Sequence, residues 1–280
     1  MRVLVTGVKG QLGYDICNIL NNKNIANIGV DIEDFDITDA NATISFIKSY
    51  NPDIIIHCAA YTAVDKAEEN VELCKKININ GTQNIVEACK ITQSKFVFFS
   101  TDYVFNGEKS IKEEYEVDDY PSPLSVYGKS KLAGEQIVLA GLIKYYIIRT
   151  SWMFGKNGTN FIETIIRLCK THATIDVVCD QIGSPTYTVD LAEAVCKIIF
   201  TEKYGVYQIT NSGFCSWADF AENIIAALSY PTKVNRILSE NYNTKAIRPK
   251  NSKLSKSSLV KSGFDILPPW EDALLRYLDM

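Results

Sequence analysis

The chain has 280 residues, of which 46% are hydrophobic and 22% charged, so its composition is that of a folded globular protein. Its 29 basic and 33 acidic residues give a net charge of −4, which argues against a protein that tracks the phosphate backbone of nucleic acid. Eight cysteines without a Cys-x-x-Cys pair favour free thiols in a reducing cytosol. No apolar segment is long enough to suggest a secretion signal or a membrane span, so we expect a cytoplasmic protein.

Short apolar runs alternate with stretches in which apolar residues recur at helical spacing. Unbroken apolar strands are typical of parallel sheets that helices cover on both faces, so this rhythm predicts a doubly wound α/β fold of the Rossmann type. The predicted strands lie near residues 3–5, 28–30, 54–56, 96–99 and 145–148.

The pattern loosens after about residue 155. We therefore expect a Rossmann domain over 1–155, with 187–202 packed against it, and a smaller lobe made mainly of 156–280 that includes a short strand near 205–209. Ligands of such folds bind beyond the carboxyl ends of the strands, which here means the cleft between the two lobes.

Three glycines, Gly7, Gly10 and Gly13, follow the first predicted strand and precede the first predicted helix. In this context Gly7 permits a tight turn, Gly10 lets the backbone approach a pyrophosphate, and Gly13 lets the helix pack closely. The amino end of the helix then attracts the phosphates. The motif predicts a dinucleotide-binding turn rather than a merely structural one.

Asp31 ends the second predicted strand, where its carboxylate can accept hydrogen bonds from the adenosine ribose hydroxyls of NAD. Asp36 and Ile37 follow, within reach of the adenine. No Lys or Arg lies between Asp31 and Ile47, so the 2′-phosphate of NADPH would need a partner elsewhere, for which Lys9 is the candidate. We therefore expect either cofactor to be used, NADH at least as well as NADPH. The alternative is that Asp31 is only a solvated strand end.

Tyr127 and Lys131 are four residues apart at the start of a predicted helix, so they share one helical face. A tyrosine with its ordinary pKa of about 10 is a weak acid–base at neutral pH, but an adjacent ammonium favours ionisation and is expected to lower that pKa. The run from Ser100 to Asp102 closes the fourth predicted strand and supplies a hydroxyl that can hold a carbonyl oxygen beside Tyr127.

Only two histidines are present, so a zinc site built from several His ligands is excluded and we expect no metal. His57 ends an apolar run, which favours a structural or pocket-wall role over catalysis. The acidic run 113–119 is interpreted as a solvated loop.

With these motifs in place, the sequence resembles the extended short-chain dehydrogenase/reductase superfamily, and within it the family of dTDP-4-dehydrorhamnose reductases. The resemblance is carried, in the family's order, by residues 6–13, 58–68, 100–105, 127–135, 149–152 and 180–186, and it is looser from 187 to 280.

This resemblance implies a role for each matching residue. Thr101, Tyr127 and Lys131 would form the catalytic set, and Asp102, Tyr103 and Trp152 would face the sugar nucleotide, although Trp152 could instead be a core aromatic. The cofactor contacts would be Gly10, Gln11, Leu12, Asp31, Asp36, Ile37, Ala60, Tyr61, Thr62 and Lys131.

The residue at position 103 distinguishes reduction from the elimination of water, a reaction of related enzymes. Dehydratases of the superfamily carry Thr-Asp-Glu at this strand end, because elimination of water needs a further acid and base, whereas here the third residue is Tyr103. The resemblance therefore implies reduction of the C4 ketone of dTDP-4-dehydro-6-deoxy-L-mannose to dTDP-L-rhamnose for surface polysaccharide. The alternatives are reduction of another nucleotide-linked 4-keto-6-deoxy sugar, or a non-catalytic regulatory subunit of the same fold. A monomer or homodimer is expected.

Charge is segregated near the carboxyl end of the chain. Six basic residues and no acidic one lie between Lys245 and Lys261. Arg248, just before Pro249, is the candidate for a forked hydrogen-bond donor to the substrate diphosphate, and the other basic residues are interpreted as a solvated face.

Overall fold

The centre of the molecule is a six-stranded parallel sheet with the strand order β10-β5-β4-β3-β1-β2, in a computed structural model that describes residues 1–279. The order reverses at β1, as the doubly wound fold requires, so the predicted fold class is confirmed. The strands are β1 (Val3–Thr6), β2 (Asn27–Val30), β3 (Ile54–His57), β4 (Lys95–Thr101), β5 (Tyr145–Thr150) and β10 (Gly205–Gln208).

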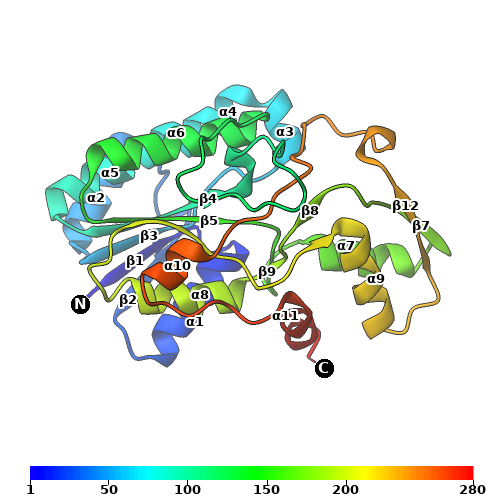
Figure 1. The fold of residues 1–280 in the computed structure, drawn as a ribbon. Helices are drawn as coiled ribbons and strands as arrows, with labels where there is room; N and C mark the ends of the chain where they lie inside the picture. Colours follow the sequence, from blue (N-terminus) through cyan, green and yellow to red (C-terminus); the bar gives the residue numbers. More distant parts are fainter. Residues whose placement is uncertain (280) are drawn as a thin grey trace.

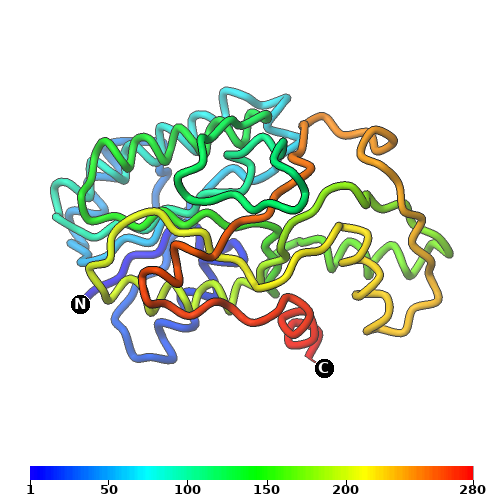
Figure 2. Tube along the Cα trace, in the orientation of Figure 1, coloured from blue at the N-terminus to red at the C-terminus, as the bar shows by residue number. Residues whose placement is uncertain are grey.

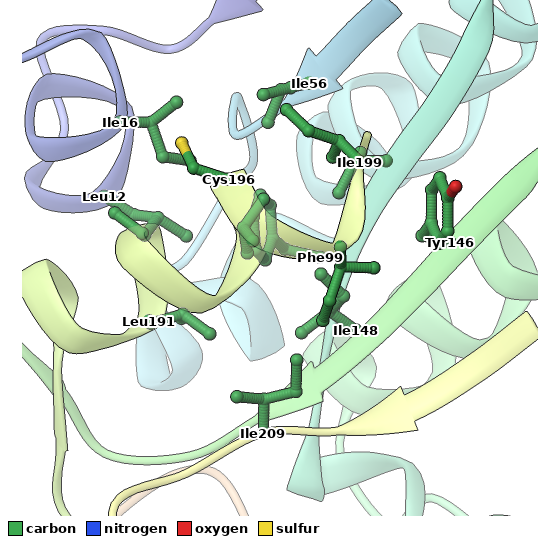
Figure 3. Packing of buried hydrophobic residues seen from close by; sticks show 14 of the residues in the cluster. Leu12, Ile16, Ile56, Phe99, Tyr146, Ile148, Leu191, Cys196, Ile199 and Ile209 are labelled. Atoms are coloured by element: carbon green, nitrogen blue, oxygen red, sulfur yellow. The ribbon is translucent and has the colours of Figure 1, made fainter. Parts of the chain in front are cut away.

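Helices cover both faces of this sheet (Figure 1). On one face lie α1 (Gln11–Asn22) and α8 (Thr188–Ile198); on the other lie α2 (Ala40–Tyr50), α5 (Thr82–Thr92) and α6 (Val126–Gly141). Side chains alternate between the faces along each strand, so Val5 packs toward α1 and α8 while Leu4 packs toward α2 and α5. Figure 3 shows the first core, where Leu12 and Ile16 of α1 lie on the side of α8 that carries Leu191 and Cys196.

A smaller lobe has its own apolar core, built from α7 (Phe161–Cys169), α9 (Trp217–Ala227), α11 (Trp270–Tyr277) and the parallel pair β7 (Thr174–Val178) and β12 (Lys233–Ile237). Two short pairs join this lobe to the sheet. They are β6 (Met153–Phe154) with β9 (Thr186–Tyr187), and β8 (Ile182–Gly183) with β11 (Cys215–Ser216).

The strand near 205–209, expected in the smaller lobe, lies instead at the edge of the large sheet. β10 pairs in parallel with β5, and Val206 and Tyr207 pack into the cores on its two faces. A strand that can bury both faces gains more apolar contact at the sheet edge than on the surface of the small lobe.

The chain also returns to the large sheet after β12, as the orange and red trace of Figure 2 shows. We call residues 249–256 the returning segment. Its backbone makes hydrogen bonds on both sides. On one side Ser252 N donates to Ile182 O at 2.7 Å, and on the other Lys253 O accepts from Tyr115 N at 2.8 Å. The segment is thereby fixed between the two lobes.

The remaining helices are short: α3 (Val64–Glu69), α4 (Val71–Lys75), α10 (Ser257–Lys261), a π-helix over Lys76–Gly81 and 3₁₀ turns at Asp102–Val104 and Ser239–Asn241. Among the helices of residues 1–279, none combines the length and apolar character needed to cross a membrane.

Candidate active site

A cavity of about 720 Å³ opens at the carboxyl ends of β1 to β5. Most of the predicted site residues line it, namely Gly7, Gly10, Gln11, Leu12, Gly13, Asp31, Asp36, Ile37, Ala60, Thr62, Thr101, Asp102, Tyr103, Tyr127, Lys131 and Trp152. Tyr61 and Arg248 are absent from its lining. Predicted residues that lie up to 145 positions apart in the sequence, from Gly7 to Trp152, therefore meet around one hollow.

The glycine turn leaves no room for side chains. Gly7 has a φ of +73°, and a Cβ added there would lie 2.6 Å from the backbone nitrogen of Ala59. A Cβ on Gly13 would collide with the carbonyl oxygen of Gly7. The turn therefore holds the amino end of α1 close against β1 and β3, and the free N–H groups of its first turn suit an anion.

Asp31 lies at the start of the loop that follows β2, and its carboxylate already has hydrogen-bond partners. Its carboxylate accepts hydrogen bonds from the backbone N–H groups of Lys9 and Ile32, both at 2.9 Å. The Lys9 ammonium, the candidate for a 2′-phosphate, lies 2.5 Å from Glu33 instead. The edge of the cavity beyond β2 is therefore acidic, and its one basic side chain already has a carboxylate partner.

The backbone of Tyr61 is held by the side chain of Asn78, a residue that belongs to none of the motifs described above. The buried Asn78 amide accepts from Tyr61 N at 2.7 Å and donates to Tyr61 O at 3.1 Å and to Ser130 Oγ at 2.9 Å. Asn78 lies in the π-helix, a local irregularity that often marks functional sites. The only sign of this role in the sequence is that Asn78 is a polar residue on the inner side of a helix.

Tyr127 and Lys131 lie in the first turns of α6, which begins at the Ser125 cap, where Ser125 Oγ accepts from Gly128 N at 3.1 Å. Lys131 is 4% exposed, and its ammonium lies 4.2 Å from the ring centre of Phe98. Burial lowers the pKa of Lys131 to about 8, although the carboxylate of Glu135 one turn later opposes this shift. Glu135 itself is paired with Arg149, at 2.7 Å.

The ionisation of Tyr127 differs from the sequence expectation. Burial raises the pKa of the phenol above its ordinary value, and the nearby Asp102 carboxylate adds to this effect. Since Lys131 is itself buried and has a lowered pKa, its charge does not offset the loss of solvent around Tyr127. The phenol therefore keeps its proton at neutral pH.

Thr101 and Asp102 form a buried hydrogen-bonded pair next to Tyr127. Thr101 Oγ donates to Asp102 Oδ1 at 2.9 Å and accepts from Tyr103 N at 3.2 Å. The second carboxylate oxygen of Asp102 accepts from Ser252 Oγ at 2.6 Å. Burial raises the pKa of Asp102 to about 6, and the two hydroxyl hydrogen bonds oppose that rise. The contact with Ser252 was not anticipated from the sequence.

Trp152 lines the cavity and stacks on Trp217, with ring centres 3.6 Å apart. Its φ of +47° is rare for a bulky residue, and such strain is kept where the surrounding structure enforces it. Gly183 allows this arrangement, because a Cβ there would lie 2.7 Å from the indole. The pair forms a flat aromatic wall on the side of the smaller lobe.

Arg248 lies outside the cavity lining, in a forked ion pair with Asp65 of α3. Its two terminal nitrogens donate to the carboxylate at 3.1 and 2.6 Å. Neighbouring Lys245 pairs with Glu69 of the same helix. The segment 245–248 is therefore attached to α3, and a ligand diphosphate would have to compete with Asp65 for this guanidinium.

His57 also lines the cavity, but its surroundings are structural. Its Nδ1 lies 2.8 Å from Thr6 Oγ1, its ring packs against the rings of Phe96 and Phe98, and burial lowers its pKa to about 3. The imidazole is therefore neutral. Within residues 1–279, no group of three or more His, Cys, Asp or Glu residues could hold a metal ion.

Comparison with known proteins agrees with this geometry. Residues 1–280 match the family model described as RmlD substrate binding domain. The spore coat polysaccharide biosynthesis protein SpsK of Bacillus subtilis is 40% identical over 99% of this chain and 96% of its own length. A dTDP-4-dehydrorhamnose reductase of Aggregatibacter actinomycetemcomitans is 41% identical over 98% of this chain and 97% of its own.

A comparison with solved structures also finds a dTDP-4-dehydrorhamnose reductase that matches nearly the whole chain. The dTDP-4-dehydrorhamnose reductase of Bacillus anthracis in complex with NADP superimposes with a TM-score of 0.96 and 41% identity, over 99% of this chain and 98% of that one. The match covers both lobes and the returning segment, so it extends beyond the dinucleotide-binding half that many folds share. The chain therefore belongs to the RmlD substrate binding domain family.

Proposed function

We propose that this protein is a reductase that uses NADH or NADPH to convert the C4 ketone of dTDP-4-dehydro-6-deoxy-L-mannose to the alcohol of dTDP-L-rhamnose. One observation carries the proposal: the glycine turn and the Thr101, Tyr127 and Lys131 side chains line the same cavity. The relatives from Aggregatibacter actinomycetemcomitans and Bacillus anthracis, which match nearly the whole chain, are named for this reaction, and this supports the assignment.

The cavity fits a nicotinamide dinucleotide. The glycine turn and the amino end of α1 would hold the pyrophosphate, and Asp31 would accept from the adenosine ribose. Lys131, buried at the inner end, would hold the nicotinamide ribose. When bound, the reduced cofactor supplies a hydride. The remaining cofactor contacts would be Gln11, Leu12, Asp36, Ile37, Ala60, Tyr61 and Thr62.

Tyr127 would donate the proton that the C4 oxygen needs. A proton donor must be protonated before the reaction, and the raised pKa of Tyr127 keeps it so. Thr101 and Tyr127 would both donate hydrogen bonds to the ketone oxygen. Trp152, Asp102 and Tyr103 would complete the sugar side of the cavity.

Reduction is favoured over elimination because Tyr103 occupies the place of a second acid. Burial raises the pKa of Tyr103, so it offers a neutral phenol where a dehydratase needs a carboxylate.

We infer that NADH serves at least as well as NADPH. Asp31 and Glu33 make the ribose edge acidic, and Lys9 is paired with Glu33. A 2′-phosphate placed there would meet like charge. We also infer a Rossmann part over 1–155 with 187–202, a substrate lobe mainly from 156–280, and a monomer or homodimer in the cytosol, where the eight free cysteines stay reduced.

The test is turnover of purified protein with dTDP-4-dehydro-6-deoxy-L-mannose, followed by loss of NADH absorbance and identification of the product sugar. Formation of dTDP-L-rhamnose supports the proposal. Turnover only with a different nucleotide-linked 4-keto-6-deoxy sugar would change the substrate but keep the reaction. Absence of turnover with every such sugar, despite NADH binding, would favour a non-catalytic subunit.

A further inference from the structure

The returning segment brings one side chain into the catalytic network from 150 residues away. Ser252 is 4% exposed and Asp102 is 2% exposed, and Ser252 Oγ donates to Asp102 Oδ2 at 2.6 Å. The other carboxylate oxygen accepts the hydrogen of Thr101 at 2.9 Å. One buried carboxylate therefore links a hydroxyl at the end of β4 to a hydroxyl of the returning segment.

We propose that Ser252 is a positioning residue of the ketone-reducing site, which keeps Asp102 hydrogen-bonded while the Thr101 hydroxyl turns its hydrogen from that carboxylate to the substrate. This inference rests on the function proposed above. It gives Ser252 a role through Asp102 and Thr101, without contact to the reacting atoms.

A threonine hydroxyl carries a single hydrogen and can donate it to only one acceptor at a time. In the structure Thr101 gives that hydrogen to Asp102, so Thr101 cannot polarise a ketone at the same time. When the hydrogen moves to the ketone, Asp102 loses a partner in a site where water does not replace it. Ser252 then supplies the hydroxyl hydrogen bond that remains.

Ser252 is held rigidly enough for this task. Its backbone N donates to Ile182 O at 2.7 Å. The adjacent Asn251 side chain donates to the carbonyls of Ser110 and Glu113 at 2.9 and 3.0 Å. The hydroxyl is therefore presented by a segment that is fixed on both sides, which is what a supporting residue of an active site requires.

The hydrogen bond from Ser252 is expected to have a measurable effect on the pKa of Asp102. The titratable side chains that face it are the phenols of Tyr103 and Tyr127, and burial keeps both protonated at neutral pH. Burial raises the pKa of Asp102 to about 6, and the hydrogen bond from Ser252 is the largest opposing influence. Removal of that hydrogen bond should raise the pKa further.

The kinetic test compares Ser252→Ala with Ser252→Thr and Ser258→Ala. We expect Ser252→Ala to lower kcat by about 10- to 100-fold, as a misplaced catalytic group does, with the KM for NADH within about twofold. Ser252→Thr keeps a hydroxyl and should restore most of the rate. Ser258→Ala is the matched control, since it removes a buried hydroxyl that has no hydrogen-bond partner in the described residues. Unchanged kcat in Ser252→Ala would overturn the proposal.

A second measurement needs no turnover, so it separates failure of this inference from failure of the proposed function. The Asp102 carboxyl is titrated by ¹³C NMR in wild type, Ser252→Ala and Ser258→Ala. A rise in the Asp102 pKa in Ser252→Ala alone supports the link, and an unmoved pKa overturns it. If the alanine variant fails to fold, Ser252→Cys keeps the shape with a weak donor and is judged by both readouts.

Discussion

At the scale of single residues, Tyr127 shows how burial sets the protonation state of a proposed proton donor. A phenol with a raised pKa holds its proton firmly until negative charge develops nearby, as it does on a ketone oxygen that receives hydride. We expect Tyr127→Phe to keep the fold and NADH binding but to lower turnover by about 100- to 10,000-fold. Steady-state kinetics with a parallel NADH titration measures both, and near-wild-type turnover would rule out Tyr127 as the proton donor.

In the proposed mechanism Lys131 supports activity, while the burial of its ammonium costs stability. Its pKa falls from 10.5 when unfolded to about 8 in the fold, so the unfolded chain binds more protons between these values and stability rises with pH across this window. Below pH 8 the buried ammonium lowers the free energy of unfolding.

Lys131→Met should therefore lose turnover and cofactor affinity, yet melt at a higher temperature than wild type at pH 7. The difference should shrink as the pH approaches 10. Thermal unfolding of the cofactor-free protein across this range is the measurement. A lower melting temperature than wild type at pH 7 would contradict the burial argument.

At the scale of elements, the loop after β2 determines the charge at the cavity edge where the adenosine ribose is proposed to bind. Glu33→Ala frees the Lys9 ammonium from its exposed partner. Because exposed pairs are weak, we expect the ratio of kcat/KM for NADPH to that for NADH to rise only about three- to tenfold.

Lys9→Ala in the same background should cancel the gain, which makes the double variant the control. In the wild type, a preference for NADPH of a hundredfold or more would contradict the proposed cofactor choice.

The helices and strands differ in how far they could be predicted from the sequence. The strands β1 to β5 and the glycine turn could be predicted because their signals are local: unbroken apolar runs and glycines at a strand end. β10 could not be placed, because its four residues carry no sign of which strand they pair with. Ser252 and Asn78 were missed for the same reason, since their roles depend on residues 150 and 17 positions away.

At the scale of the whole molecule, segment 245–248 joins the region after β12 to α3. Arg248→Ala should raise the substrate KM at least tenfold, about 1.4 kcal/mol, while NADH affinity barely changes. The structure pairs Arg248 with Asp65 and leaves it outside the cavity lining, so the prediction requires the guanidinium to exchange partners when the diphosphate arrives.

Lys245→Ala is the control for this prediction, since Lys245 belongs to the same segment and also pairs with α3. An unchanged substrate KM in Arg248→Ala, measured under the same conditions, would assign the guanidinium to structure alone.

The returning segment also has a consequence for biosynthesis of the chain. Apart from Trp217, the residues that line the cavity lie between positions 6 and 159, whereas Ser252 is made near the end of translation. Domains fold from the amino end as they emerge from the ribosome. A nascent chain can thus form most of the cavity wall before the hydroxyl that completes the Asp102 network has been made. If the proposed function holds, we expect the chain to gain cofactor binding before catalytic competence.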